Sequence, residues 1–115
     1  MAPFVKDLTD NDIQELATHY SKLGPRPSEE KPDPALVARG EKIAVQRRCA
    51  SCHLPSLAGQ DQMPRLAKQR IDYMTMAMVD YLKDKRTGAD TAMTAAIFGL
   101  SADDITALAH YAASR

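Results

Sequence analysis

The sequence predicts an all-α fold. In four stretches, apolar residues recur at the i, i+3 and i+4 spacing of one helical face. Residues suited to capping a helix start, Thr9, Asp33 and Ser101, precede three of these stretches. No segment shows the apolar–polar alternation of a half-buried strand. The length, 115 residues, suits one domain or one domain with an extension.

The composition fits a globular protein with few large side chains for a core. Hydrophobic residues make up 44% and charged residues 26%. Because 15 basic residues balance 15 acidic ones, we expect neither nucleic acid nor an anionic membrane surface as a partner. No apolar run is long enough for a transmembrane segment. Only two Phe, four Tyr and no Trp are present, so the core of such a small domain would be thin.

The first predicted element is a helical extension in residues 1–23. Residues 1–8 are expected to form a loop, and Thr9 is the expected N-cap of an amphipathic helix. Gly24 and Pro25 are expected to end the helix. Its apolar face comprises Ile13, Leu16, Ala17 and Tyr20.

A proline-rich linker is predicted for residues 24–34. Four prolines among eleven residues, interleaved with charges, favour an extended chain without a core. We therefore expect the second domain to comprise residues 35–115. Asp33 and Pro34 form a helix start, with Asp as N-cap and Pro at the first helical position. The helix that follows carries Leu36, Val37, Ile43 and Ala44 and leads to Arg47, Arg48 and Cys49.

The stretch Cys49-Ala50-Ser51-Cys52-His53 has the C-x-x-C-H pattern of c-type haem attachment. Two thiols at this spacing can each form a thioether with a haem vinyl group, and the adjacent imidazole can bind the iron. A redox dithiol would need a preceding strand, and a zinc site would need four ligands, whereas only His19 and His110 remain. The motif predicts one covalently bound haem c, with Cys49 and Cys52 as attachment sites and His53 as iron ligand. The buried porphyrin would also fill the thin core.

Two further helices are predicted after the motif. Residues 54–68 are expected to be irregular, with Pro55, Gly59 and Pro64 interrupting them. A helix is expected from Arg70 to Leu82, then a charged turn over 83–88 and a segment of small residues over 89–99. Ser101 is expected to cap the last helix. The apolar stripes are Ile71, Met74, Met78, Tyr81 and Leu82 in the first helix, and Ile105, Leu108, Ala109 and Ala112 in the last.

The second axial ligand of the iron is expected to be a methionine, the common distal ligand of electron-transfer cytochromes. Met74 and Met78 lie on the apolar stripe and are expected to pack in the core. Met93 lies in what we expect to be a loop between the last two helices, from which its side chain can reach the distal face. Met93 is therefore the preferred metal ligand. Met63, which we expect at the haem edge, is the second choice, and Met76 is a further candidate.

The two ends of the chain resemble each other. Residues 1–17 align without gaps to residues 93–109, which places Met1 on Met93 and the cap Thr9 on Ser101. Any two capped amphipathic helices share such periodicity. The matching distance from methionine to cap favours the other interpretation, that residues 1–23 are the last helix of an upstream domain of the same type. The other matched pairs are Leu8 with Leu100, Asp12 with Asp104, Ile13 with Ile105, Leu16 with Leu108 and Ala17 with Ala109.

Residues 35–115 resemble the class I cytochrome c domains, most closely the C-terminal half of tandem dihaem cytochromes of the cytochrome c4 type. Three stretches carry the resemblance: 49–53, 59–69 and 100–111. The second begins Gly59-Gln60-Asp61-Gln62-Met63-Pro64-Arg65-Leu66, and the third begins Leu100-Ser101-Ala102-Asp103-Asp104-Ile105. Tyr73, Tyr81, the 83–88 turn and Met93 match as well. Two positions depart from it: Leu54 and Lys68 stand where relatives commonly have glycine.

The resemblance implies a small class I cytochrome c fold and a set of haem contacts. It implies that the carbonyl of Pro64 meets the ring N–H of His53. We expect Arg65 to reach a haem propionate or to lie solvated at the surface. Leu66 and Tyr73 are expected to pack on the porphyrin.

The sequence therefore predicts a one-electron carrier, not an enzyme, with His53 and Met93 as axial ligands. Its partners would be redox proteins, namely an oxidase, reductase or dehydrogenase, and a second haem domain in the parent chain. One alternative is a haem enzyme or gas sensor with an open sixth site. Another is the domain through which electrons enter a larger dehydrogenase or oxidase. Because haem c is normally attached outside the bacterial cytoplasm, we expect a periplasmic protein whose signal peptide is absent from this chain.

Overall fold

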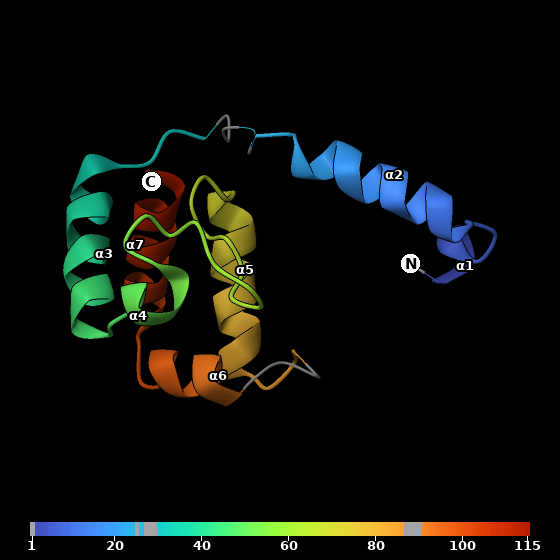
Figure 1. Cartoon of the computed structure of the whole chain (residues 1–115). Coiled ribbons are helices and arrows are strands. Elements are labelled where there is room, and N and C mark those ends of the chain that lie inside the picture. The colour runs from blue at the N-terminus through green and yellow to red at the C-terminus, as the bar shows by residue number, and fades with distance from the viewer. Residues whose placement is uncertain (1, 25, 27–29, 87–90) are drawn as a thin grey trace.

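The computed structural model describes residues 2–24, 26, 30–86 and 91–115 (Figure 1). Across these residues it is helical, and the only β pairing there is an isolated bridge between Gln60 and Met63. The all-α prediction is confirmed. Three expected features fall outside the described residues: the pairing of Met1 with Met93, the helix stop at Pro25, and the glycine of the charged turn, Gly88.

Helices α3 (Pro34–Gln46) and α7 (Ala102–Ala113) run antiparallel and form the centre of the bundle. Each begins at the predicted cap. The Asp33 carboxylate accepts hydrogen bonds from the N–H groups of Ala35 and Leu36, and Ser101 forms a reciprocal capping box with Asp104. These caps satisfy N–H groups that have no partner within their own helix.

Gly40 sets the close approach of α3 and α7. A Cβ atom on this residue would lie 2.1 Å from the carbonyl oxygen of Ala107 and 2.8 Å from Cβ of Tyr111. Only a residue without a side chain fits this crossing.

Helix α5 (Ile71–Leu82) packs against α7, and the shorter α6 (Thr91–Ile97) contacts α5 (Figure 1). The core lies between these helices and the loop of residues 54–68. Many of its residues are small, as the composition predicts. The buried apolar residues described are Ile43, Ala44, Leu57, Ala67, Met74, Ala77, Met78, Ile97, Ile105, Ala107, Leu108, Ala109, Tyr111 and Ala112.

Two local predictions were wrong, and one was incomplete. Helix α3 leads to the motif as predicted, but it ends at Gln46, and the motif lies on a separate short helix, α4 (Ala50–His53), that follows the positive φ of 55° at Arg48. Residues Ala2–Val5 form a short helix, α1, instead of a loop. Met93 lies on α6, not in a loop, because alanine-rich segments favour helix even without an apolar stripe.

Helix α2 (Asp10–Ser21) starts at Thr9 as predicted and ends with Lys22 as its C-cap. It buries no residue, and Ile13, Leu16 and Tyr20 on its apolar face are 52%, 43% and 65% exposed. Figure 1 shows α2 set apart from helices α3 to α7. The sequence leads us to expect that this face packs on the 35–115 domain or on another copy of the chain; within the single chain it stays exposed.

Candidate functional site

Helix α4 presents the two thiols and the imidazole of the motif on one short turn. The N–H of Cys49 donates to the carbonyl of Ala44 at 3.0 Å, so the motif follows directly from the last turn of α3. Both cysteines are free thiols, Cys49 half-buried and Cys52 exposed. Burial raises the pKa of the Cys49 thiol, although the charge of Arg47 acts in the opposite direction. Neither thiol is engaged in a disulfide, so both are open to thioether formation.

The imidazole of His53 is the one buried polar side chain in the described part of the chain, at 7% exposure. Its Nδ1 lies 2.9 Å from the carbonyl oxygen of Pro64, which is the contact that the resemblance implies. A carbonyl can only accept, so Nδ1 carries the proton and donates. In the neutral ring this leaves Nε2 as the unprotonated nitrogen that can act as a metal ligand, in an orientation fixed by the Pro64 bond.

Gly59 lets the 54–68 loop fold back beneath His53. It has a φ of +75°, and a Cβ atom there would lie 2.5 Å from the carbonyl oxygen of Met63 and 2.7 Å from the carbonyl carbon of Pro64. Its N–H donates to the carbonyl of His53 at 3.0 Å. The turn therefore brings Pro64 and His53 together only when residue 59 has no side chain.

Both departures from the family pattern occupy left-handed backbone positions. Leu54, directly after His53, has φ 67° and ψ 158°, a region used almost exclusively by glycine. Lys68 has φ 61°, and its N–H donates to the carbonyl of Ala112 at 3.1 Å, which ties the loop to α7. A glycine, which the resemblance leads us to expect at both positions, would adopt these φ values without strain, whereas this chain adopts them with a side chain present.

The methionines that could supply the second axial ligand lie on α5, on α6 and in the 54–68 loop. Met74 and Met78 of α5 are buried in the core, as predicted, whereas Met76 is 53% exposed. Met93 is half-buried on α6 and packs against the core cluster. Met63 is half-buried in the loop that carries Pro64.

The remaining predicted haem contacts differ in burial. Leu66 is half-buried and packs against the core. Arg65 is exposed, and its Nε donates to the carbonyl of Ala67 at 3.2 Å. Tyr73 is 40% exposed and lines an open depression of about 580 Å³ at the start of α5. The other residues around this depression are Gln69, Arg70, Asp72 and Met76.

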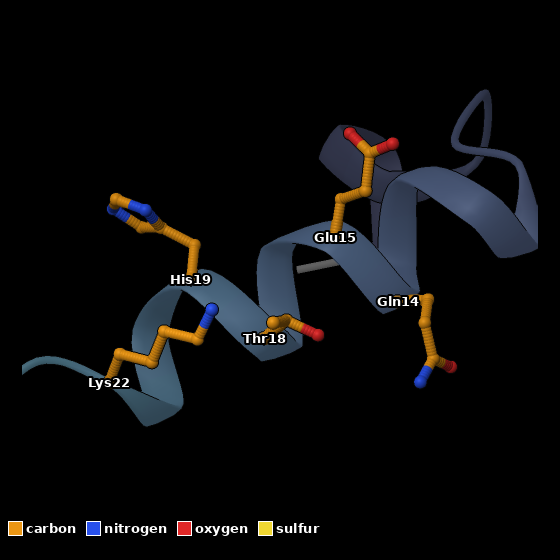
Figure 2. A pocket seen from close by; sticks show the side chains of 5 residues that line it. All are labelled: Gln14, Glu15, Thr18, His19 and Lys22. Atoms are coloured by element: carbon orange, nitrogen blue, oxygen red, sulfur yellow. The ribbon is translucent and has the colours of Figure 1, made fainter.

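A second depression lies on the extension. Figure 2 shows the polar face of α2, where Gln14, Glu15, Thr18, His19 and Lys22 line a shallow, open depression of about 340 Å³. It lies on the extension, away from Cys49 and His53, and holds no buried polar group. Across the described residues, no three His, Cys, Asp or Glu side chains are grouped to hold a metal ion.

Sequence reasoning missed two polar residues that join distant parts of the fold. The polar neighbours of His110 on its helix predict an exposed side chain, but it is half-buried and accepts a hydrogen bond from the linker at Asp33. Glu30, in the middle of the expected linker, accepts one from the first residue of α5. No local pattern signals either contact, because the partners are far apart in sequence.

Comparison with known proteins decides the family. A family model described as cytochrome c matches residues 37–115. The chain belongs to the cytochrome c family. This cytochrome c domain binds haem c covalently, with Cys49 and Cys52 fitting the attachment motif, and electron transfer is the function that the family implies. The residues present fit the group: two free thiols, and a buried imidazole with Nε2 left for iron.

The similar proteins are mainly dihaem-type cytochromes. A cytochrome c4 of Thiocapsa roseopersicina is 29% identical over 96% of this chain and 62% of its own length. A solved cytochrome c4 of Pseudomonas stutzeri is also 29% identical, with a TM-score of 0.76, and 63% of it is covered. A thiosulfate dehydrogenase (TsdBA) of Marichromatium purpuratum is 29% identical with a TM-score of 0.71, but only 27% of it is covered. The chain thus spans less than two thirds of these proteins.

A solved cytochrome c4 of Acidithiobacillus ferrooxidans, 23% identical with a TM-score of 0.78, shares the fold. The prediction of a class I cytochrome c fold resembling the cytochrome c4 type is confirmed. In the described part of the chain, no single helix is long and apolar enough to cross a membrane.

Proposed function

We propose that this domain is a one-electron carrier in which His53 and Met93 are the axial ligands of the haem iron. The observation that carries the proposal is the bond from His53 Nδ1 to the Pro64 carbonyl, because it orients the ring and leaves Nε2 for the metal. Haem c, when bound, supplies an iron that takes up and releases one electron. With both axial positions filled by side chains, no site is left for a substrate.

The roles of the surrounding residues follow from their positions. Pro64 raises the basicity of His53 by accepting its ring proton. Leu66 and Tyr73 exclude water from the porphyrin, and Arg65 provides a cation for a propionate. Met93 is favoured over Met63 because it lies on a helix packed against the core, which fixes its side chain more firmly than a loop does.

Optical spectra of the oxidised and reduced holoprotein, together with intact mass, test this proposal. We expect the mass of one covalently bound haem and a sulfur-to-iron charge-transfer band at the red end of the oxidised spectrum. Met93→Ala should abolish the band, whereas the matched control Met63→Ala should keep it. If the wild-type protein lacks the band and binds CO readily when reduced, the sixth site is open and the carrier function is wrong.

A second proposal concerns the extension. Residues 1–23 are the final helix of a preceding haem domain, and 24–34 link it to this one. The matching capping boxes of α2 and α7, the exposed apolar face of α2 and the partial coverage of the dihaem relatives support it. The parent reading frame tests it: a second C-x-x-C-H motif should lie upstream, and its absence would contradict the tandem arrangement.

Partners and location follow from the same reasoning. The domain would exchange electrons with redox proteins of the bacterial periplasm, where haem c is attached. The likeness to one part of a thiosulfate dehydrogenase favours, as a second candidate, a domain that carries electrons for a larger redox enzyme. Domains fused to the parent chain would distinguish the two: a catalytic domain in the same chain supports the second candidate.

A further inference from the structure

The last residues of the linker are held by the haem domain at two points. The N–H of Asp33 donates to Nδ1 of His110 at 2.9 Å, although the two residues are 77 positions apart. The carboxylate of Glu30 accepts from the N–H of Ile71 at 3.1 Å, across 41 positions. These two bonds connect four consecutive linker residues to α7 and α5.

Asp33 is fixed from two sides. While its N–H is bound to His110 of α7, its carboxylate caps α3 through bonds of 2.7 Å to the N–H of Ala35 and 3.3 Å to that of Leu36. Its backbone is therefore tied to both central helices. Because a ring nitrogen that accepts must be unprotonated, His110 carries its proton on Nε2 in this arrangement.

Glu30 provides a cap that α5 lacks locally. The residue before this helix, Arg70, makes no side-chain cap, and the N–H of Ile71 has no partner within the helix. A carboxylate is favoured at a helix N-terminus by the exposed N–H groups and the helix dipole. The pKa of Arg70 is raised first by its bond to Asp72 and in smaller part by the charge of Glu30, which agrees with a carboxylate placed beside it.

We propose that Glu30 and His110 are positioning residues that clamp residues 30–33 to the haem domain and so restrict where the preceding haem domain can lie. The proposal rests on the tandem arrangement proposed above for its functional meaning, but the clamp itself is a property of this chain.

The clamp moves the point at which the haem domain first holds the linker from Asp33, the N-cap of α3, to Glu30. At roughly 3.1 Å per residue for an extended proline-rich chain, this shortens the reach of the linker by about 9 Å. Since electron tunnelling falls steeply with distance, holding the two haem domains closer together would favour transfer between them. A proline-rich segment alone would space the domains but would not fix the direction in which the chain leaves this one.

Amide hydrogen exchange in the holo form of the 115-residue chain tests the clamp. We expect the amides of Asp33 and Ile71 to be protected in the wild type. His110→Leu should make Asp33 exchange roughly five- to tenfold faster, and Glu30→Ala should do the same for Ile71. His110→Asn and Glu30→Gln are the matched controls, because each keeps an acceptor oxygen near the original position and should restore protection.

The paramagnetic Fe(III) haem provides a second measurement. Pseudocontact shifts of the α2 amides should shrink in the double variant Glu30→Ala/His110→Leu, since α2 then samples more orientations. Unprotected Asp33 and Ile71 amides in the wild type, or equal exchange in the Leu and Asn variants, would overturn the clamp. If the amides of Asp33 and Ile71 are protected but the parent chain lacks a second haem motif, the clamp stands and only the tandem arrangement is refuted.

Discussion

Helices α2 and α7 have the same length, 12 residues, and the same reciprocal capping box, yet only α7 is buried. Thr9 and Asp12 cap the first, and Ser101 and Asp104 cap the second. Ile105 is 2% exposed, whereas Ile13 at the matching position of α2 is 52% exposed. The same local signals therefore produce one surface helix and one central helix of the core.

The difference lies in what each helix offers a neighbour. At the crossing with α3, the backbone carbonyl of Ala107 on α7 lies where a Cβ of Gly40 would be, and Ala107 itself is 0% exposed. The matching residue of α2 is Glu15. A cap and a periodic apolar face thus specify a helix, but burial depends on a partner surface shaped for that helix.

The largest expected effect is the difference in stability between substituting Ile105 and substituting Ile13. Ile105→Ala should lower the free energy of unfolding by roughly 2–5 kcal/mol, because it leaves a cavity in the core. Ile13→Ala should change it by less than about 0.5 kcal/mol, because the side chain is already in solvent. Urea unfolding of the holoprotein measures both. Equal effects would mean that α2 is packed in solution and that the contrast is wrong.

The two glycines next to these helices give the second comparison. In Gly40→Ala the new Cβ would meet the Ala107 carbonyl, so α3 and α7 must move apart, at a cost of about 3 kcal/mol. Gly24→Ala adds a Cβ with nothing within 4 Å and should be neutral within about 0.5 kcal/mol. Thermal unfolding followed by circular dichroism checks both. A neutral Gly40→Ala would show that the helices cross elsewhere.

Removing either capping side chain should have a smaller effect, which appears in domain stability for α7 and in helix content for α2. Ser101→Ala should cost the whole domain about 1 kcal/mol, because α7 unfolds only with the core. Thr9→Ala should lower the helicity of α2 and leave the unfolding of the domain unchanged. Amide exchange within α2, measured beside global denaturation, separates the two. If Thr9→Ala changed the stability of the domain, α2 would have to contact the core.

Lowering the pH should weaken both capping boxes. Hydrogen bonds from the cap hydroxyls, Ser101 for Asp104 and Thr9 for Asp12, hold the pKa of each carboxyl below its ordinary value of 3.8. The ionised carboxylate then stabilises the folded state above that value, and this contribution is lost as the pH falls through the lowered pKa.

The readouts again differ between the helices. Asp104→Asn should flatten the acid limb of domain stability between about pH 5 and about pH 2. Asp12→Asn should affect only the helix content of α2 over the same range. An acid limb unchanged by Asp104→Asn would show that other carboxyls determine it.

Periodicity and caps predicted α2, α3, α5 and α7 because both are local properties of the chain. Helix α6 was missed because its alanines form helix without an apolar stripe, and that error also misplaced Met93 in a loop. The break at Arg48 was missed because a positive φ at a residue other than glycine leaves no local pattern.

The site likewise has parts that the sequence predicts and parts that it does not. The C-x-x-C-H motif is contiguous, so the haem attachment was readable from the sequence. The contact of His53 with Pro64 came from resemblance, and its physical basis in the turn at Gly59 required the backbone. The bonds of Glu30 and His110 join residues far apart in sequence, which no local pattern encodes.

The pairing of Arg39 with Asp104, beside Gly40, joins residues 65 positions apart. Forming this crossing requires closure of a long loop, which contains the haem motif, and such non-local contacts slow folding. Helix α2 needs no such closure and would form and melt within about 0.1–1 μs. The α3–α7 crossing is therefore expected to limit the folding rate of the domain, so Gly40→Ala should slow refolding while the α2 relaxation stays unchanged.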